Sequence, residues 1–168
     1  MGLVEDVARS VQVFTDGVRR RDLGKVLSIY ASDAVFSPAW SDEAGRGMRR
    51  GAGEIKIAFE NLFKDARHLS VSFRTQPSEA TVHRIGKDHA AFAGYYKISK
   101  LLSTSIVEVH AKFVFVYSLG QGGSVEVVTH NSMLSPKGIV RVRGHLSKFN
   151  AYLAKREEEA SSPSPSPS

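Results

Sequence analysis

Apolar and polar residues in the first third of the chain follow a helical period. Between Leu3 and Arg20 the apolar positions are three or four residues apart and fall on one helical face; they are Val4, Val7, Val11, Phe14 and Val18. Asp22 is expected to cap a second helix, Leu23–Tyr30, because its side chain can accept hydrogen bonds from the first helical amides. The same spacing predicts a third helix from Glu54 to Lys64.

Strand patterns dominate after residue 67. We predict strands over 68–76, 79–85 and 89–102, and a hairpin formed by 107–119 and 124–134. The first strand of the hairpin is rich in β-branched and aromatic residues from Phe113 to Tyr117, which suit a buried pleated surface. The turn between its strands, Gly120-Gln121-Gly122-Gly123, supplies glycines for a tight reversal. A short strand at 34–37 and a loop at 38–53 precede the third helix.

Helices followed by strands predict an α+β domain whose helices cover one face of an antiparallel sheet. Phe113, Phe115 and Tyr117 alternate with Val114 and Val116, so both faces of this strand are apolar. Because three helices can cover only one face, we expect the other face to pair with a second copy of the chain. We divide the chain into a domain at 1–136, a basic segment and helix at 137–160, and a disordered Ser-Pro tail at 161–168.

Composition excludes several classes of function. The chain has 168 residues and a net charge of +6, and it has no cysteine, so disulfides and thiolate chemistry are ruled out. The basic residues are scattered and no nucleic-acid motif accompanies them, so we expect no nucleic-acid partner. No apolar run is long enough to span a membrane and no secretory signal is legible, so we expect a cytoplasmic protein without a membrane partner.

Three local patterns carry a resemblance to a known family. They are the opening Tyr30-Ala31-Ser32-Asp33-Ala34-Val35-Phe36, the helix that follows Gly53, and the final hairpin ending in His130-Asn131-Ser132-Met133-Leu134-Ser135-Pro136. Together they resemble the NTF2-like (SnoaL-like) cone fold, in which three helices pack into the mouth of a curved antiparallel sheet. The His/Ser-rich end resembles the branch that contains the association (hub) domain of calcium/calmodulin-dependent protein kinase II. The predicted C-terminal helix, from His145 to about Glu158, lies outside this resemblance.

The hub resemblance implies a protein that assembles rather than catalyses. Hub domains dimerise through their sheets and form rings, so we expect a homodimer or larger ring, with a cavity for a small anionic ligand and no cofactor. The alternative is a small-molecule enzyme such as an isomerase, a cyclase or an iota-class carbonic anhydrase. That last class, which works without metal, has hydroxyl-bearing residues where this chain has Ala39 and Ala58, and its second His and Ser correspond to Asn131 and Met133. These departures count against carbonic anhydrase activity.

The candidate site residues centre on the last strand. His130 and Ser132 are two positions apart, so they share a face, and this spacing suits a histidine that orients or deprotonates a ligand. A polar pair near the cone mouth or at a subunit interface would show the same spacing. Of Tyr95 and Tyr96, one should line the cavity, and we name Tyr96. Lys97 could hold a carboxylate as a point charge, although an exposed strand lysine is the alternative.

Other candidates come from the helices and the glycine-rich loop. Trp40 could cover the pocket or simply cover the edge of the core. Asp16 or Asp33 could replace His130 as a base, but no Asp–His pair is legible. Arg46, Arg49 and Arg50 could meet an anion, but a solvated loop is expected. With no cysteine and no histidines at ligand spacing, we predict no metal site.

Overall fold

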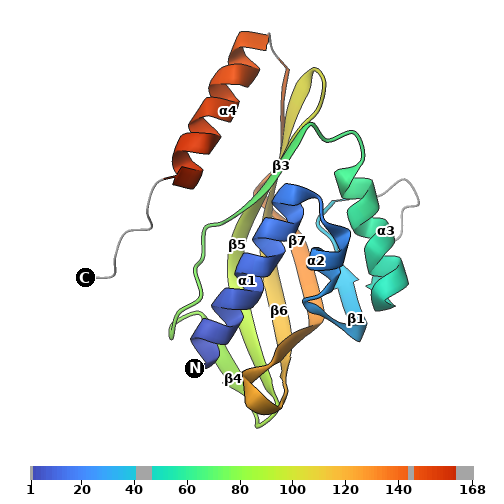
Figure 1. Cartoon of the computed structure of the whole chain (residues 1–168), viewed down its shortest axis with the longest axis vertical. Coiled ribbons are helices and arrows are strands. Elements are labelled where there is room, and N and C mark those ends of the chain that lie inside the picture. Colours follow the sequence, from blue (N-terminus) through green and yellow to red (C-terminus); the bar gives the residue numbers. More distant parts are fainter. Residues whose placement is uncertain (1, 41–46, 144–145, 162–168) are drawn as a thin grey trace.

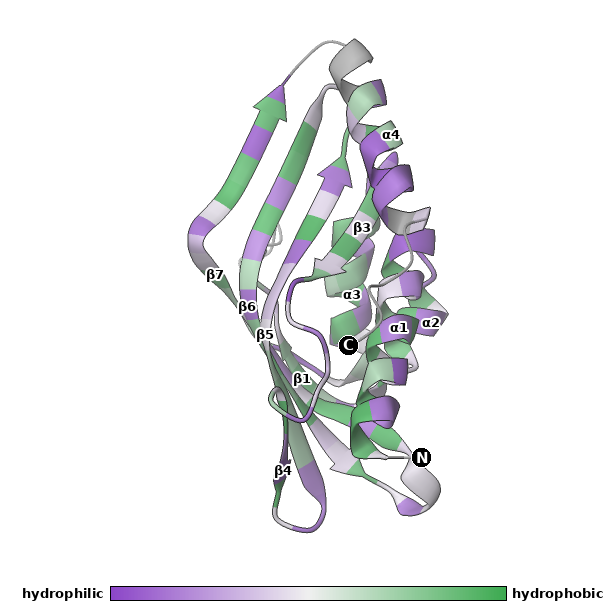
Figure 2. Ribbon diagram, turned by 90° about the vertical axis from the view of Figure 1, so that its left-hand side faces the viewer, coloured by the Kyte–Doolittle hydropathy of each residue, from purple (hydrophilic) through white to green (hydrophobic). Residues whose placement is uncertain are grey.

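The computed structural model describes residues 2–40, 47–143 and 146–161, and the predicted tail beyond Ser161 lies outside them. The described residues form an α+β fold with four α-helices and one curved seven-stranded sheet (Figure 1). Helices α1, α2 and α3 lie along one side of the sheet, and α4 lies beside its upper end (Figure 2). None of the described helices is both long and apolar enough to cross a membrane.

The three N-terminal helices are α1 (Leu3–Arg20), α2 (Leu23–Leu27) and α3 (Gly51–Phe63). The predicted cap of α2 is confirmed, since the Asp22 carboxylate accepts a hydrogen bond from the amide of Lys25 at 3.0 Å. Helix α2 packs closely on α1 because Gly17 has no side chain; a Cβ there would lie 2.7 Å from Val26. Helix α2 ends three residues before the predicted end, because Tyr30 already belongs to the first strand.

The sheet has the strand order β2-β1-β7-β6-β5-β3, with β4 paired to β5. Its strands are β1 (Tyr30–Ser37), β2 (Arg49–Arg50), β3 (His68–Phe73), β4 (Val82–Ile85), β5 (His89–Leu101), β6 (Ser105–Leu119) and β7 (Val125–Arg143). The predicted hairpin is present as β6 and β7. The sheet is mixed rather than wholly antiparallel, because β1 pairs in parallel with β7. This pairing joins the N-terminal part of the chain to its last strand.

Strand β7 is nine residues longer at its end than predicted and passes through Pro136, where we placed a domain boundary. Its register with β6 shifts between the pairs Ala111–Leu134 and Val109–Ile139, so four residues of β7 oppose one residue of β6. Proline lacks a backbone N–H and is tolerated in strands at such bulges. The bulge therefore explains how the strand continues past a residue that usually ends one.

The two faces of the sheet have different cover. The inner face carries Phe113, Phe115 and Tyr117, which are at most 2% exposed and form the core with α1 and α3. The outer face is covered at one end by α4 (Leu146–Ser161). There Tyr152 and Leu153 pack on Leu101 and Ile106. The helix that we predicted near the C-terminus thus covers part of the face that we expected to meet a second copy.

Candidate functional site

His130 lies on the inner face of β7 and is completely buried, with an exposed fraction of zero. Its ring is 4.4 Å from that of Phe36 and 4.2 Å from that of Phe115, measured between centroids. The ring of Phe14, from α1, meets it edge-on at 6.0 Å. The imidazole is therefore enclosed by aromatic rings from a helix and two neighbouring strands.

Three hydroxyl groups surround the two ring nitrogens. The Tyr30 hydroxyl lies 2.7 Å from Nδ1 of His130. On the other side, Nε2 lies 3.0 Å from Oγ of Ser132 and 3.3 Å from the hydroxyl of Tyr96. The Tyr96 and Ser132 hydroxyls are also hydrogen-bonded to each other. We call these four residues the His130 cluster.

The strand register explains why distant residues meet in this cluster. His130 and Ser132 are two positions apart on β7 and therefore share its inner face. Phe36 of β1 pairs directly with His130, and this pairing brings Tyr30, at the start of β1, close to the cluster. Tyr96 of β5 pairs with Ala111 of β6, which in turn pairs with β7. Since Ala111 is small, the Tyr96 side chain can reach across β6 to the hydroxyl of Ser132.

The cluster is uncharged at neutral pH. Burial lowers the pKa of His130 to about 3, so the imidazole is neutral. Burial also raises the pKa of Tyr30 and of Tyr96, so both phenols keep their protons. A neutral imidazole has one donor and one acceptor nitrogen. The cluster thus offers a ligand both donors and an acceptor within a few ångströms of each other.

Trp40 lies over two of the rings that enclose this cluster. Its indole meets Phe36 at 5.5 Å and Phe59 at 5.9 Å, both edge-on. Phe36 and Phe59 are themselves stacked, with centroids 5.3 Å apart. Unlike these two phenylalanines, Trp40 is only partly buried. Both functions that we considered for it, as core cover and as a cover of the site, are consistent with this position.

Arg49 is buried, contrary to our expectation of a solvated arginine. It is 1% exposed and pairs with Phe36 across β1 and β2. Paired residues share a face, so its side chain starts on the inner side of the sheet, and its backbone lies two strands, or about 10 Å, from that of His130. Sequence reasoning dismissed this residue because the flanking glycines resembled an exposed loop, and the two-residue strand β2 gave no pattern.

Lys97 does not join the cluster. It follows the inward-facing Tyr96 and therefore lies on the outer face, where its Nζ is 3.6 Å from Glu108. The same carboxylate is 3.2 Å from Nε2 of His110. Burial, opposed by Glu108, lowers the pKa of Lys97. Successive side chains of a strand point to opposite faces of the sheet. Lys97 could therefore meet His130 only if it occupied an inward position such as that of Tyr96.

Neither acidic alternative reaches His130. Asp16 lies on the flank of α1, within 3.4 Å of Arg19 and 3.8 Å of Lys25, and Asp33 is exposed on β1. No group of acidic or histidine side chains among the described residues could hold a metal ion. Of the predicted site residues, the structure therefore brings together His130, Ser132 and Tyr96, and it places Trp40 nearby.

Tyr30 is the member of the cluster that sequence reasoning missed. We assigned it to the inner side of the second helix, where its hydroxyl had no evident role. Its hydrogen-bond partner is 100 residues away in the sequence. The sequence shows an aromatic residue, Tyr30, at the start of this segment. Only the parallel pairing of β1 with β7 shows which residue its side chain meets.

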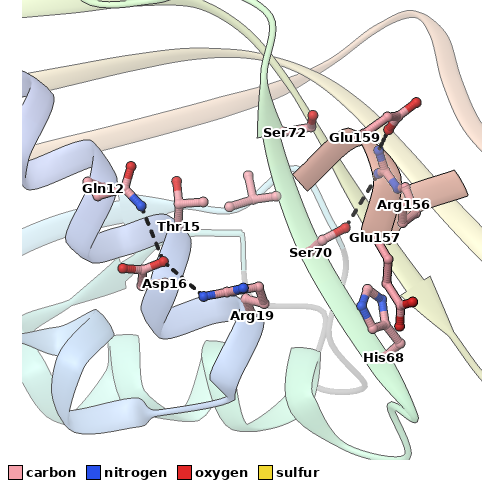
Figure 3. Close-up of a pocket in the computed structure, with 11 residues that line it drawn as sticks. Gln12, Thr15, Asp16, Arg19, His68, Ser70, Ser72, Arg156, Glu157 and Glu159 are labelled. Carbon is pink, nitrogen blue, oxygen red and sulfur yellow. Dashed lines mark hydrogen bonds and ion pairs between the residues drawn. The ribbon is translucent and has the colours of Figure 1, made fainter. Parts of the chain in front are cut away.

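A cleft of about 450 Å³ lies away from the cluster, between α1, β3 and α4 (Figure 3). One flank of α1 contributes Gln12, Thr15, Asp16 and Arg19, and α4 contributes Arg156, Glu157 and Glu159. Arg156 donates hydrogen bonds to Ser99 at 2.9 Å and to Glu159 at 2.9 Å. Most of the charged groups in the cleft are thus paired within the protein, and the cleft has no aromatic wall.

Comparisons with known proteins agree on the fold. No family model and no curated protein matches the chain. Among solved structures, a nuclear transport factor 2-like superfamily protein from Salmonella enterica matches with a TM-score of 0.64 and 9% identity, over 79% of this chain and 90% of that one. A ketosteroid isomerase-like protein from Erwinia carotovora matches with a TM-score of 0.60 and 14% identity, over 79% and 97%.

A third structure, a type 3 hexachlorocyclohexane dehydrochlorinase from Novosphingobium barchaimii, matches with a TM-score of 0.66 and 14% identity. The match covers 84% of this chain and 90% of that one. At these identities the likeness concerns the fold, and none of these neighbours is described as a hub domain. The curved sheet with helices packed into it is therefore the cone fold of the NTF2-like proteins.

Proposed function

We propose that this protein is a cone-fold enzyme that moves a proton on a small oxygen-bearing molecule at the His130 cluster. The observation that carries the proposal is the gathering of four neutral polar side chains inside an otherwise apolar core. Burying polar groups is unfavourable unless each is hydrogen-bonded, and an apolar core of the same volume would be simpler to build. Retaining such a network in the centre of a cone is what a site for small-molecule chemistry requires.

The chemistry follows from the two kinds of group in the cluster. The acceptor nitrogen of His130 can take a proton from a carbon next to a carbonyl group, and a tyrosine hydroxyl can donate a hydrogen bond to the oxygen that gains negative charge. A pKa of about 3 belongs to the closed site without ligand. Negative charge developing on a ligand beside the ring would stabilise the imidazolium and raise this pKa.

Structural neighbours support this class of reaction more than they support assembly. One neighbour is a hexachlorocyclohexane dehydrochlorinase, and another is described as ketosteroid isomerase-like. Elimination of hydrogen chloride and isomerisation of a ketone both include the transfer of a proton from carbon to a base. Fold analogy alone does not transfer a function, so the argument depends on the cluster itself. For the carbonic anhydrase version, which retains only His130 and Ser132, we predict no metal-free hydration of carbon dioxide above background.

The test uses 5-nitrobenzisoxazole, a general probe for bases buried among apolar side chains. Removal of its carbon-bound proton breaks the N–O bond and releases a coloured phenolate. We expect the protein to accelerate this opening, and we expect His130→Gln to lower kcat/KM by about a hundredfold or more. Tyr96→Phe should lower it less, because only the stabilisation of the oxygen is lost.

The matched control is His89→Gln, which removes an exposed histidine on β5 and should leave the rate unchanged. Circular dichroism and thermal unfolding of each variant separate lost chemistry from lost structure. A protein with no rate above buffer, or a His130→Gln variant as active as the parent, would refute the enzyme proposal. The cluster would then be a structural network of the core.

Assembly through the outer face is a second candidate, and a specific observation favours it. Tyr95, Val114 and Met133 surround Lys112 on the outer face and are 47%, 38% and 60% exposed. Exposed apolar side chains grouped on three neighbouring strands are typical of a surface that meets a partner. A homodimer formed through this patch also fits the hub resemblance. For a small anion, the buried Arg49 is a cation on the inner face of the described sheet.

Light scattering coupled to size-exclusion chromatography tests the assembly. We expect a dimer or larger ring at micromolar concentration, and Met133→Lys should shift it toward the monomer by placing a charge in the patch. Lys56→Glu on α3 is the control, since Lys56 lies on an exposed helix surface. A parent protein that is monomeric at these concentrations would exclude assembly through this face.

A further inference from the structure

We propose that Trp40 closes the His130 site, and that the ligand of this site carries a flat ring that takes the place of the indole against Phe36 and Phe59. The proposal rests on the proposed function, because it assumes that a ligand reaches His130. It adds the side chain that must move and the kind of group that replaces it. Neither follows from the fold or from the chemistry of the cluster.

The enclosure of His130 leaves few ways in. The side chains in ring contact with it are at most 7% exposed; they are Phe14, Tyr30, Phe36, Tyr96 and Phe115. Each of them packs inside the core between a helix and the sheet. Moving any one of them opens the centre of the protein. A ligand needs a route whose cover is attached at the surface.

Trp40 meets this requirement. It is partly exposed, it follows the end of β1 at Ser37, and it touches Phe36, whose ring lies directly on His130. Its indole nitrogen has no hydrogen-bond partner in the part of the chain that the structure describes. Its described attachments are edge-on ring contacts and packing on the core, and such ring contacts contribute modestly beyond the area that they bury.

The surface beneath the indole defines the replacing group. Phe36 and Phe59 are parallel to within 3°, and the indole meets both of them at steep angles, 61° and 63° between ring planes. Aromatic edges favour the face of another aromatic ring, since the edge is positive and the face negative. A flat ring bound there would be separated from His130 by the ring of Phe36.

Chemical modification of histidine tests the cover without requiring any catalytic activity. Diethyl pyrocarbonate acylates neutral, accessible imidazoles, and peptide mass spectrometry locates each modified residue. In the parent protein we expect the exposed His83 and His89 to react and His130 to stay unmodified. In Trp40→Ala we expect the modification rate of His130 to rise at least tenfold.

Two controls separate local opening from unfolding. His110 is 5% exposed on the opposite face of the sheet, and it should stay protected in Trp40→Ala as long as the fold is intact. Phe63→Ala removes another partly buried ring that packs on Phe59, at 6.1 Å, and it should leave His130 protected. Trp40→Leu provides a smaller change should Trp40→Ala unfold, and we expect it to give an intermediate rate.

Free indole then tests whether the group that replaces the Trp40 side chain must be a flat ring. In Trp40→Ala, added indole should occupy the vacated space and protect His130 again, whereas hexanol at the same concentration should not. If His130 in Trp40→Ala and Trp40→Leu reacts no faster than in the parent, Trp40 does not close the site. If hexanol protects as well as indole, the requirement for a flat ring is wrong. Neither result depends on whether the protein opens 5-nitrobenzisoxazole.

Discussion

Single residues of the His130 cluster link the folding of this protein to pH. The pKa of His130 is about 3 in the folded protein, against about 6.5 in an unfolded chain. Between these values only the unfolded chain takes up the proton. The contribution of His130 to the free energy of unfolding is therefore highest above pH 6.5 and falls by about 1.4 kcal/mol per pH unit as the pH drops toward 3.

Urea unfolding at pH 7, 6 and 5 measures this slope. His130→Gln should reduce it, and His89→Gln, which replaces an exposed histidine, is the matched control. Burial also lowers the pKa of His68 and of His110, which adds to the slope of every variant. The difference between the two variants isolates His130. Equal slopes in His130→Gln and the parent would contradict its burial as a neutral group.

The hydroxyls of Tyr96 and Ser132 should stabilise the protein together. We expect Tyr96→Phe and Ser132→Ala each to lower the free energy of unfolding by about 1–2 kcal/mol, because each leaves a buried partner unsatisfied. In the double variant the losses should fall short of their sum by at least about 0.5 kcal/mol, since both act through one hydrogen bond.

Tyr95, the neighbour of Tyr96, is a control because its side chain points to the opposite face of the sheet. It lies on the outer face and is 47% exposed, so Tyr95→Phe should change stability by less than about 0.5 kcal/mol. Additive losses at Tyr96 and Ser132 would mean that their hydroxyls are not coupled in solution.

At the level of elements, the sequence predicted what local periodicity determines. The stripe from Val4 to Val18 identified α1, and the run from Phe113 to Tyr117 identified β6. The parallel pairing of β1 with β7 was not predictable, because a parallel contact between distant segments leaves no local pattern. His130, Ser132 and Tyr96 lie in strands with a local pattern and were predicted as candidates. Tyr30 was not, because its role depends on the parallel pairing.

Burial that depends on tertiary contacts was also out of reach. Arg49 reads as a loop arginine, and only its pairing with Phe36 shows that it is enclosed. Pro136 reads as a strand end, but a bulge of β7 accommodates it. In both places the local preference of the residue is overruled by its neighbours across the sheet.

Helix α4 should be the least firmly held element of the described chain. Its described contacts with the sheet include Tyr152 and Leu153 on Leu101 and Ile106, together with the hydrogen bonds of Arg156 to Ser70 and Ser99. We expect Leu153→Ala with Arg156→Gln to release α4 while the cone stays folded, because none of the α4 side chains that the structure describes belongs to the main core. Amide hydrogen exchange measures both regions separately.

The matched control is Lys155→Gln, which changes an exposed neighbour on the same helix. It should leave exchange in α4 as slow as in the parent. If the double variant instead accelerates exchange in β5 and β6 as much as in α4, the helix is an integral part of the cone and not a separately docked element.

At the scale of the whole molecule, the proposed association through the outer face predicts that stability depends on protein concentration. If copies associate through Tyr95, Val114 and Met133, folding and association are linked, and Tm rises with protein concentration. Scanning calorimetry at low and high micromolar concentration should show this rise in the parent and not in Met133→Lys. A Tm independent of concentration in both proteins would argue that the patch stays exposed.

The hydrogen bond between Tyr30 and His130 also determines how early the core can form during translation. The two residues are 100 positions apart, and a ribosome adds about 5–20 residues each second. Tyr30 is therefore made about 5–20 s before the residue that satisfies it. Until β7 has been made, the edge of β1 that pairs with it is exposed to water or bound by chaperones. The centre of this protein is complete only after His130 has been made.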